Sequence, residues 1–132
     1  MTSHVHLIFR SIEEQNPELL LGDFKRFTSR SVIKAIKENP RESRKEFLLD
    51  YFKKEAQKTS NTTNNQFWRH DNQPIEIWSL KVFEQKIDYT HNNPVEEGFV
   101  FRSEDYKYSS ATDYAGQKGI LDNIVVFQYF KF

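Results

Sequence analysis

The stretch from Gln85 to Val100 constrains the fold most, because it combines helical periodicity with the signals that end a helix. The periodicity continues to about His91. Asn93 then precedes Pro94, as an N-cap residue precedes the first residue of a new helix, and Gly98 follows as a stop signal. The sequence therefore predicts a long helix that ends near His91 and a second helix of one turn that starts at Pro94.

The long helix carries one tyrosine, Tyr89, away from its apolar stripe. Phe83, Ile87 and Thr90 recur at helical spacing, so we expect this stripe to face the core. At 100° per residue, Tyr89 lies about 120° away from the stripe. Its hydroxyl is therefore either solvated at the edge of an amphipathic helix or presented to a ligand.

Residues 3–10 alternate in the manner of a β-strand, with His4 and His6 on one face and an apolar opposite face. Side chains two residues apart on a strand lie roughly 6.6 Å apart and point the same way. Two imidazoles so placed can bind one divalent ion. A His-x-His motif also occurs by chance, so this pattern alone leaves both interpretations open.

Composition excludes several classes of protein. The chain has 132 residues and no cysteine, which excludes disulfides and zinc–thiolate sites. We expect a single domain over residues 1–132. No apolar run approaches the about 18 residues of a membrane helix, so we expect a cytoplasmic protein without membrane attachment.

The charge is balanced overall but uneven along the chain. The formal net charge is zero, yet residues 23–58 contain 11 Lys and Arg against 6 Asp and Glu. Such a basic helical segment is typical of a surface that faces a polyanion. A solvated helix surface explains the same pattern, so both interpretations stay open.

The remaining pattern predicts alternating helices and strands. We expect helices over residues 19–38, 41–58, 79–91 and 109–114, and strands over residues 5–10, 66–70 and 75–78. Residues 124–127 are either a strand or a docked tail. Large apolar side chains at helical spacing are expected to point inward, namely Phe24, Phe27, Val32, Ile36, Phe47, Leu48, Tyr51, Phe52 and Ala56.

Two motifs taken together are specific: His-Val-His-Leu at residues 4–7 and Asp-Tyr-Thr-His-Asn-Asn-Pro-Val-Glu-Glu-Gly-Phe-Val at residues 88–100. They resemble the REP-associated tyrosine transposases, which are HUH single-tyrosine transposases of bacterial insertion sequences. Residues 23–29, 67–71 and 106–110 match further motifs of that family in the same order. The resemblance implies an α+β fold, a ferredoxin-like domain with several helices packed on a small antiparallel sheet.

Members of the family usually carry a strand, a helix and another strand before the histidine pair. Here Met1 stands just ahead of Ser3 and His4. We therefore expect that this reading frame starts inside the domain and lacks those first elements.

The resemblance also implies a set of functional residues. Tyr89 matches the catalytic nucleophile, and His4, His6 and Asn93 match the ligands of Mg²⁺ or Mn²⁺, although Asn93 also fits the N-cap. His91 is expected to be structural or a DNA contact. Four basic residues are candidate phosphate contacts, although simple solvation explains each of them better: Lys25, Arg26, Arg30 and Lys86. Phe67 and Trp68 either stack on bases or belong to the core.

Three functions follow as hypotheses. The first is metal-dependent cleavage and strand transfer of single-stranded, hairpin-forming DNA through a 5′-phosphotyrosine intermediate, by a monomer or a homodimer. The second is a DNA-binding remnant of such a transposase with little or no turnover. The third is an interaction module with a silent tyrosine, which is favoured if the ferredoxin-like sheet does not form.

Overall fold

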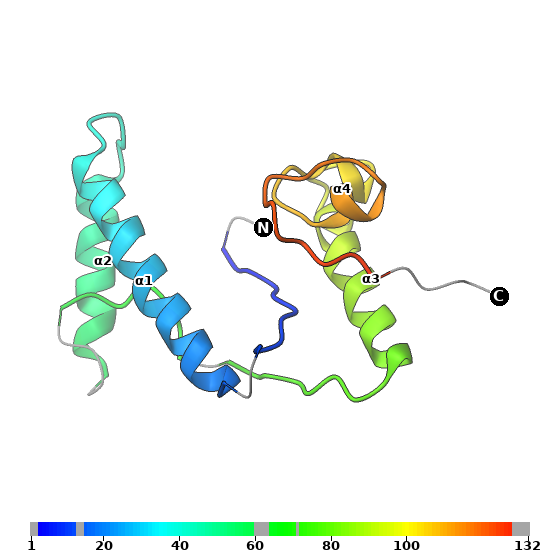
Figure 1. Ribbon diagram of the computed structural model, residues 1–132. Helices are drawn as coiled ribbons and strands as arrows, with labels where there is room; N and C mark the ends of the chain where they lie inside the picture. Colours follow the sequence, from blue (N-terminus) through cyan, green and yellow to red (C-terminus); the bar gives the residue numbers. More distant parts are fainter. Residues whose placement is uncertain (1–2, 13–14, 60–63, 71, 128–132) are drawn as a thin grey trace. The chain divides into compact units, whose positions relative to one another are not determined.

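The computed structural model describes residues 3–12, 15–59, 64–70 and 72–127. The chain divides into two compact units (Figure 1). The hairpin unit comprises Arg10–Pro74, and the tyrosine unit comprises Met1–Phe9 together with Ile75–Phe132. Of the helices in the described ranges, none has the length and apolar character that a membrane span requires.

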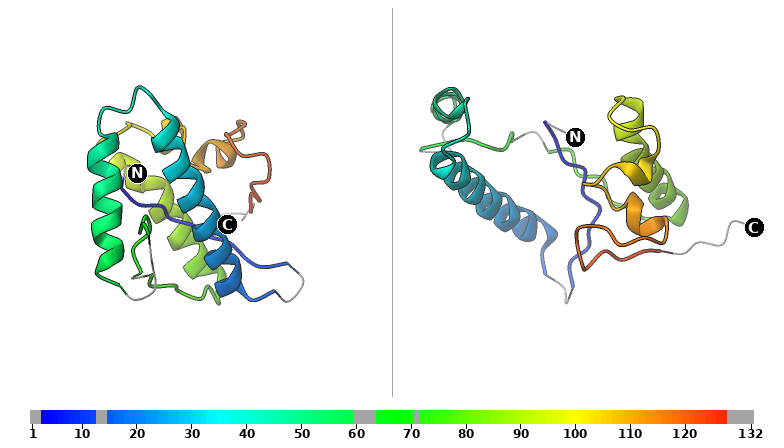
Figure 2. Two further views of the ribbon diagram at one scale, coloured as in Figure 1. Left: turned by 90° about the vertical axis from the view of Figure 1, so that its left-hand side faces the viewer. Right: turned by 90° about the horizontal axis from the view of Figure 1, so that it is seen from above.

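Two helices that lie side by side form the hairpin unit, α1 (Pro17–Glu38) and α2 (Lys45–Gln57) (Figure 2). The helix α1 starts at Pro17, slightly before the predicted start at residue 19, because Asn16 Oδ1 accepts a hydrogen bond from the Glu18 amide (2.8 Å) and proline suits the first helical position. Asn39 ends α1, and its amide donates to the Ala35 carbonyl. The helix predicted over residues 41–58 begins later, at Lys45.

The core of the hairpin unit lies between its helices. Ile33 of α1 and Phe52 of α2 are buried. The segment after α2 returns to them: Phe67 contacts the Phe52 ring edge-on at 5.4 Å, and Trp68 Nε1 donates to Thr28 Oγ1 (2.9 Å). Phe67 and Trp68 thus pack against the helices. Of the two alternatives for these residues, membership of the core describes them.

Three helical segments build the tyrosine unit: α3 (Leu80–Glu96), the 3₁₀ turn η1 (Ser103–Asp105) and α4 (Ala111–Tyr114). Ser79 is the predicted N-cap of α3, and its Oγ accepts from the Val82 amide (3.3 Å). Ile87 and Ala111 are buried where these segments meet. The predicted short helix over residues 109–114 is confirmed as α4.

The predicted break at Asn93 is wrong. The helix α3 runs through Asn93 and Pro94 to Glu96, and Pro94 lies inside it. Gly98 is the true stop, with a φ of 74°. The Gly98 amide donates to the Val95 carbonyl and the Phe99 amide to the Pro94 carbonyl, both at 2.9 Å, which is the Schellman pattern of a helix end.

Replacing Gly98 with Ala should destabilise the protein by about 1 kcal/mol, because a side chain disfavours the left-handed backbone. A Cβ at this position meets no atom within 4 Å, so the backbone conformation alone sets the cost. Gly22→Ala is the matched control, since Gly22 also has open space but lies within α1. This control should stabilise by about 1 kcal/mol. Urea unfolding of both variants measures the contrast, and equal effects would contradict it.

The expected α+β, ferredoxin-like fold is wrong for the part of the chain that the structure describes, which is helical and contains no strand or sheet. Strands require hydrogen-bonded partners. No backbone hydrogen bond involves residues 3–10 among the described residues, and none involves residues 75–78. Residues 66–70 pair with a helix instead, through the Gln66 amide and the Phe52 carbonyl (2.9 Å).

The tail of the chain is also without a strand over residues 124–127. Phe127 instead contacts the ring of Phe83 edge-on, with 4.9 Å between the ring centroids. Its amide donates to the hydroxyl of Tyr114 (3.4 Å). The docked-tail alternative therefore describes this segment.

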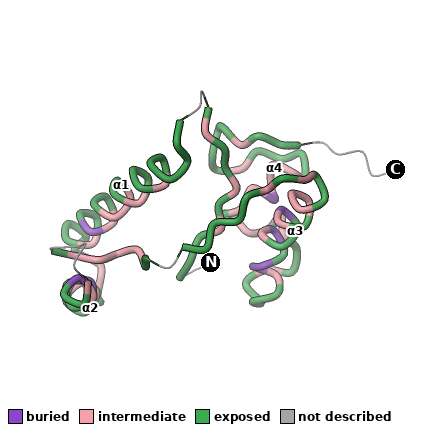
Figure 3. The backbone as a smooth tube through the Cα atoms, turned by 90° about the horizontal axis from the view of Figure 1, so that it is seen from below, coloured by how far each residue is buried: buried purple, intermediate pink, exposed green. Residues whose placement is uncertain are grey.

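Several predicted core residues are exposed. The exposed fractions are 72% for Phe27, 66% for Phe47 and 50% for Tyr51. Figure 3 shows a short buried patch on α1 and another on α2, whereas the rest of each helix is intermediate or exposed. A helix packed on one neighbour buries one stripe, so apolar residues beside that stripe remain in water.

Candidate functional site

The tyrosine unit brings together three of the four predicted catalytic and metal-binding residues. The His4 and His6 rings lie edge to face with centroids 5.0 Å apart. The His6 ring lies edge to face with Tyr89 at 5.3 Å. His4, His6 and Tyr89 therefore form a continuous row of rings, although 83 positions in the sequence separate His6 from Tyr89.

The alternation predicted for residues 3–10 survives without a strand. His6 and Ile8 are half-buried, whereas Val5, Leu7 and Phe9 are exposed. The polar face of the segment thus contacts Tyr89 of α3, and its apolar face stays open. Period-two alternation correctly predicted which side chains share a face.

His6 has an unsatisfied polar atom. Its Nε2 is buried and has no hydrogen-bond partner in the described ranges. Burial lowers the pKa of His6, and the neighbouring His4 lowers it further. The ring is therefore held in its neutral form, which is the form that binds a metal ion. A buried polar nitrogen without a partner is costly, so a ligand bound to this atom would stabilise the site.

Asn93 is the remaining predicted ligand. It lies one turn after Tyr89 on α3 and is buried. Because α3 is continuous, the N-cap role is excluded. The Asn93 carbonyl accepts from the Glu97 amide (3.1 Å) as in any helix. Within the described residues, no hydrogen bond joins its side chain to either histidine.

The spacing of the two histidine rings matches the spacing that a shared metal ion requires. Two imidazoles that share one ion at about 2.1 Å have ring centroids about 5 Å apart, and this is the spacing of His4 and His6. The described residues contain no group of three His, Cys, Asp or Glu side chains suited to a metal. An ion here would therefore depend on both imidazoles, the amide oxygen of Asn93 and oxygens from outside the protein. Imidazole ligands favour Mn²⁺ over Mg²⁺.

His91 lies on another side of α3 and has a structural role. Its Nε2 shares a hydrogen bond of 3.0 Å with Ser110 Oγ, and its ring contacts Tyr114 edge-on at 5.0 Å. The side chain is buried, and this burial lowers its pKa, while nearby Asp88 opposes the shift. His91 thus joins α3 to α4 as a neutral imidazole.

This environment predicts a pH dependence of stability. Because the folded state lowers the pKa of His91, its contribution is complete above the ordinary value of 6.5 and is lost as the pH falls below that value. His6 acts in the same direction. His91→Gln should therefore flatten part of the decline in the free energy of unfolding between about pH 7 and pH 5. Urea unfolding at several pH values tests this, and an unchanged slope would contradict it.

The four candidate phosphate contacts differ in their surroundings. Lys25 Nζ donates to the Arg69 carbonyl (3.1 Å) and Asn72 Oδ1 (2.8 Å), and burial lowers the pKa of Lys25. Arg26 forms an exposed ion pair with Asp23 (2.8 Å). Arg30 is exposed and Lys86 half-buried, and neither has an ion-pair partner among the described residues.

Lys25 therefore stabilises the hairpin unit through these hydrogen bonds. Its Nζ also lies 6.0 Å from the centroid of the Trp68 ring. Arg30 in that unit and Lys86 in the tyrosine unit have no ion-pair partner among the described residues. Sequence reasoning placed these four residues in one class, because burial and partners cannot be read from residue type. Comparison with known proteins adds no assignment: no family model, curated protein or solved structure matches this chain.

Proposed function

We propose that the protein cleaves single-stranded DNA and transfers the cut strand through Tyr89, in the manner of a single-tyrosine transposase. The observation that supports this best is the contact of His6 with Tyr89 at 5.3 Å, with His4 beside it. A His-x-His motif that occurs by chance would not be expected to contact the tyrosine that the resemblance names as nucleophile. The proposal rests on these residues and not on a sheet.

Tyr89 is suited to attack a bulky substrate. Its side chain is 51% exposed, so its hydroxyl can reach a phosphodiester outside the protein. The phenolic oxygen attacks phosphorus, a Tyr–O–P bond forms at the 5′ side, and the bond to the 3′ oxygen breaks. The phenolic proton leaves to solvent, and the 3′ oxygen takes up a proton. Because the phosphotyrosine keeps the phosphodiester's energy, another 3′ hydroxyl can reverse the attack and join strands.

The histidines supply the second requirement. A bound Mn²⁺ or Mg²⁺ would polarise the phosphate and stabilise the negative charge that develops on it. His4 and His6 place two imidazoles beside the nucleophile, and the Nε2 of His6 has no hydrogen-bond partner among the described residues, so it would be the nitrogen that holds an ion. Lys86 lies on the same helix as Tyr89 and supplies positive charge for the DNA backbone.

A second candidate is a DNA-binding remnant, or an interaction module, without turnover. One observation favours it: no backbone hydrogen bond holds residues 3–10 among the described residues, where the resemblance implied a strand within a sheet. Histidines on an unpaired segment are less firmly positioned, and loosely held ligands lose metal affinity. The remnant predicts DNA binding without cleavage. The interaction module predicts neither DNA binding nor cleavage.

Cleavage of labelled DNA hairpins decides between these functions. With Mn²⁺ the proposal predicts a cut strand with a free 3′ hydroxyl, and with EDTA it predicts none. Cleavage rate should be followed at several protein concentrations, since a homodimer would make activity rise steeply with concentration. Binding without cleavage under all conditions would establish the remnant, and absence of binding would leave the interaction module.

A further inference from the structure

The helix α2 of the hairpin unit exposes a pair of aromatic rings that its own fold does not use. Phe47 and Tyr51 are stacked at 6.3 Å between centroids with 25° between their planes. Both rings are largely in water, with exposed fractions of 66% and 50%. They lie one turn apart, so they present a continuous aromatic surface along α2.

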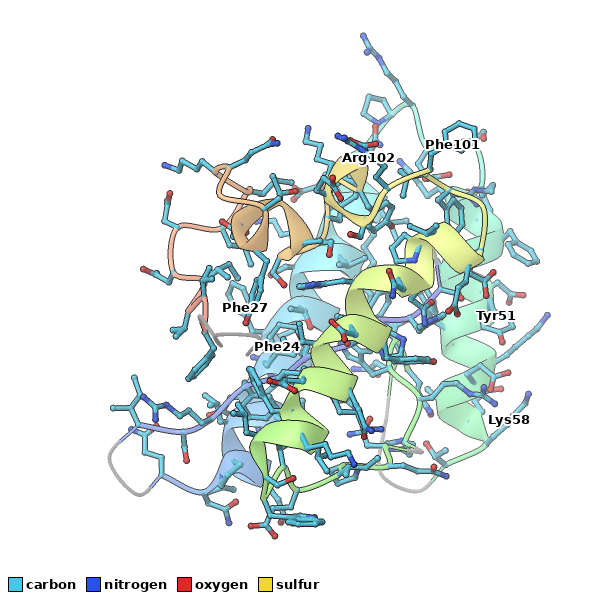
Figure 4. All side chains as sticks on the ribbon, turned by 90° about the vertical axis from the view of Figure 1, so that its right-hand side faces the viewer. Phe24, Phe27, Tyr51, Lys58, Phe101 and Arg102 are labelled. Carbon is cyan, nitrogen blue, oxygen red and sulfur yellow. The ribbon has the colours of Figure 1, made fainter. Side chains whose placement is uncertain are left out.

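Cations continue the same line. Phe47, Tyr51, Lys54 and Lys58 have spacings of four, three and four residues, which confines them to about 60° of the helix circumference. Both ammonium groups are strongly exposed, at 67% each. Figure 4 shows Tyr51 and Lys58 projecting from α2. Two aromatic rings are thus followed by two cations on one face.

We propose that this face of α2 binds single-stranded DNA, with bases stacked on Phe47 and Tyr51 and phosphates at Lys54 and Lys58. Base stacking on aromatic side chains, combined with cations that follow the backbone, is the usual basis of sequence-tolerant single-strand binding. The choice of DNA rests on the proposed function, whereas the stacking surface itself rests on α2. This surface belongs to the hairpin unit and Tyr89 belongs to the tyrosine unit, so we assign it to holding the strand and not to the cleavage step.

The neighbouring acids do not block this role. Lys54 pairs with Asp50 (2.6 Å) and Lys58 with Glu55 (2.5 Å). Solvent-exposed pairs of this kind contribute little to stability, so a phosphate can replace either carboxylate. The wider segment supports the same partner, because residues 23–58 carry 11 basic against 6 acidic residues. A polyanion complements this excess of positive charge, whereas an apolar protein surface would not.

The test is the affinity of the full chain for a fluorescent oligothymidylate of about 20 nucleotides, in EDTA and in a Tyr89→Phe background so that no cleavage occurs. The double variant Phe47→Leu/Tyr51→Leu should bind at least about tenfold more weakly. The pair Lys54→Gln/Lys58→Gln should lower the slope of log affinity against log salt by about one for each phosphate that the variant no longer binds. Leucine and glutamine favour helices, and circular dichroism verifies folding.

Matched controls exist on α1 of the same unit. Phe27 is an exposed aromatic residue without a stacked partner in the described chain, and Lys34 is an exposed cation paired with Glu38 (3.9 Å). Phe27→Leu and Lys34→Gln should leave affinity within about twofold. Equal losses of affinity from α1 and α2 variants would overturn the inference, and so would unchanged binding by the α2 variants. A changed oligomeric state in the leucine variant without DNA would overturn it too, by assigning the face to a protein contact.

The two proposals fail separately. If the wild-type chain never cleaves DNA but the α2 ring variants bind the strand more weakly, the result supports the stacking surface and contradicts the transposase chemistry. If the wild-type chain cleaves DNA through Tyr89 while the α2 variants bind DNA normally, the result supports the transposase chemistry and contradicts the stacking surface.

Discussion

Replacing Tyr89 with Phe should abolish covalent attachment of the protein to DNA, by at least about a thousandfold in adduct yield, because the nucleophile is lost outright. The fold should survive. The side chain is half exposed, and its hydroxyl makes no hydrogen bond in the described part of the chain. The phenylalanine ring also keeps the edge contact with His6. Adducts are counted on denaturing gels after incubation with a labelled hairpin and Mn²⁺.

Tyr108→Phe is the matched control, since Tyr108 is an exposed tyrosine of the same unit. It should form adducts at the wild-type level. Adducts formed equally by the Tyr89→Phe variant would show that another residue is the nucleophile, and the proposed chemistry would then be wrong.

Replacing His6 with Gln should lower Mn²⁺ affinity at least about a hundredfold, because loss of a supporting group alone costs 10- to 100-fold and loss of a direct ligand costs more. The buried Nε2 without a partner is the nitrogen expected to bind the ion. Electron paramagnetic resonance of free Mn²⁺ measures this affinity without any dependence on cleavage.

His70 offers the control, because it is an exposed histidine in the hairpin unit. His70→Gln should leave the Mn²⁺ affinity unchanged. If both variants bind Mn²⁺ as the wild type does, the histidine pair is no metal site. Cleavage by the His6 variant at the wild-type rate would likewise contradict the assigned role.

The ends of the helices could be predicted from sequence where local side chains decide them. Ser79 starts α3 as predicted, and Gly98 is a helix stop as predicted, although it stops the long helix and not a separate short one. Asn16 with Pro17 starts α1 slightly before the predicted residue 19. Each signal acts through a hydrogen bond or a backbone angle within a few residues. Asn93 with Pro94 carries the same local signal, yet both residues are buried within α3 and the helix continues through them.

Local signals of this kind are not sufficient to predict a strand. Alternation over residues 3–10 correctly places His6 and Ile8 on one face, but a strand also needs a neighbouring chain to bond with. That partner is a long-range property, and no such partner lies along this segment in the described residues. The pattern therefore predicts the faces and not the sheet.

Helical spacing identified the apolar side chains but not their depth. Phe47 and Tyr51 were expected inside with Phe52, and of these three only Phe52 is buried. A wheel of α2 gives the clue, because both rings share their line with Lys54 and Lys58 and not with Ala56. An apolar residue in line with cations is exposed more often than buried.

Local pattern could not place the candidate site, because no spacing rule brings His6 to Tyr89. Their proximity follows from the resemblance and is present in the structure at 5.3 Å. The sequence predicted equivalent phosphate contacts at Lys25, Arg26 and Arg30 from residue type alone. The surroundings separate them, since Lys25 is tied to Arg69 and Asn72 while Arg30 is exposed without an ion pair in the described ranges.

Intact-protein mass spectrometry after incubation with a hairpin and Mn²⁺ tests the central claim most directly. The account predicts a protein species heavier by the cut strand, with the nucleotide on the peptide that contains Tyr89 after digestion. The species should vanish when EDTA replaces Mn²⁺. An unmodified protein beside cleaved DNA, or a nucleotide on any other residue, would contradict the account.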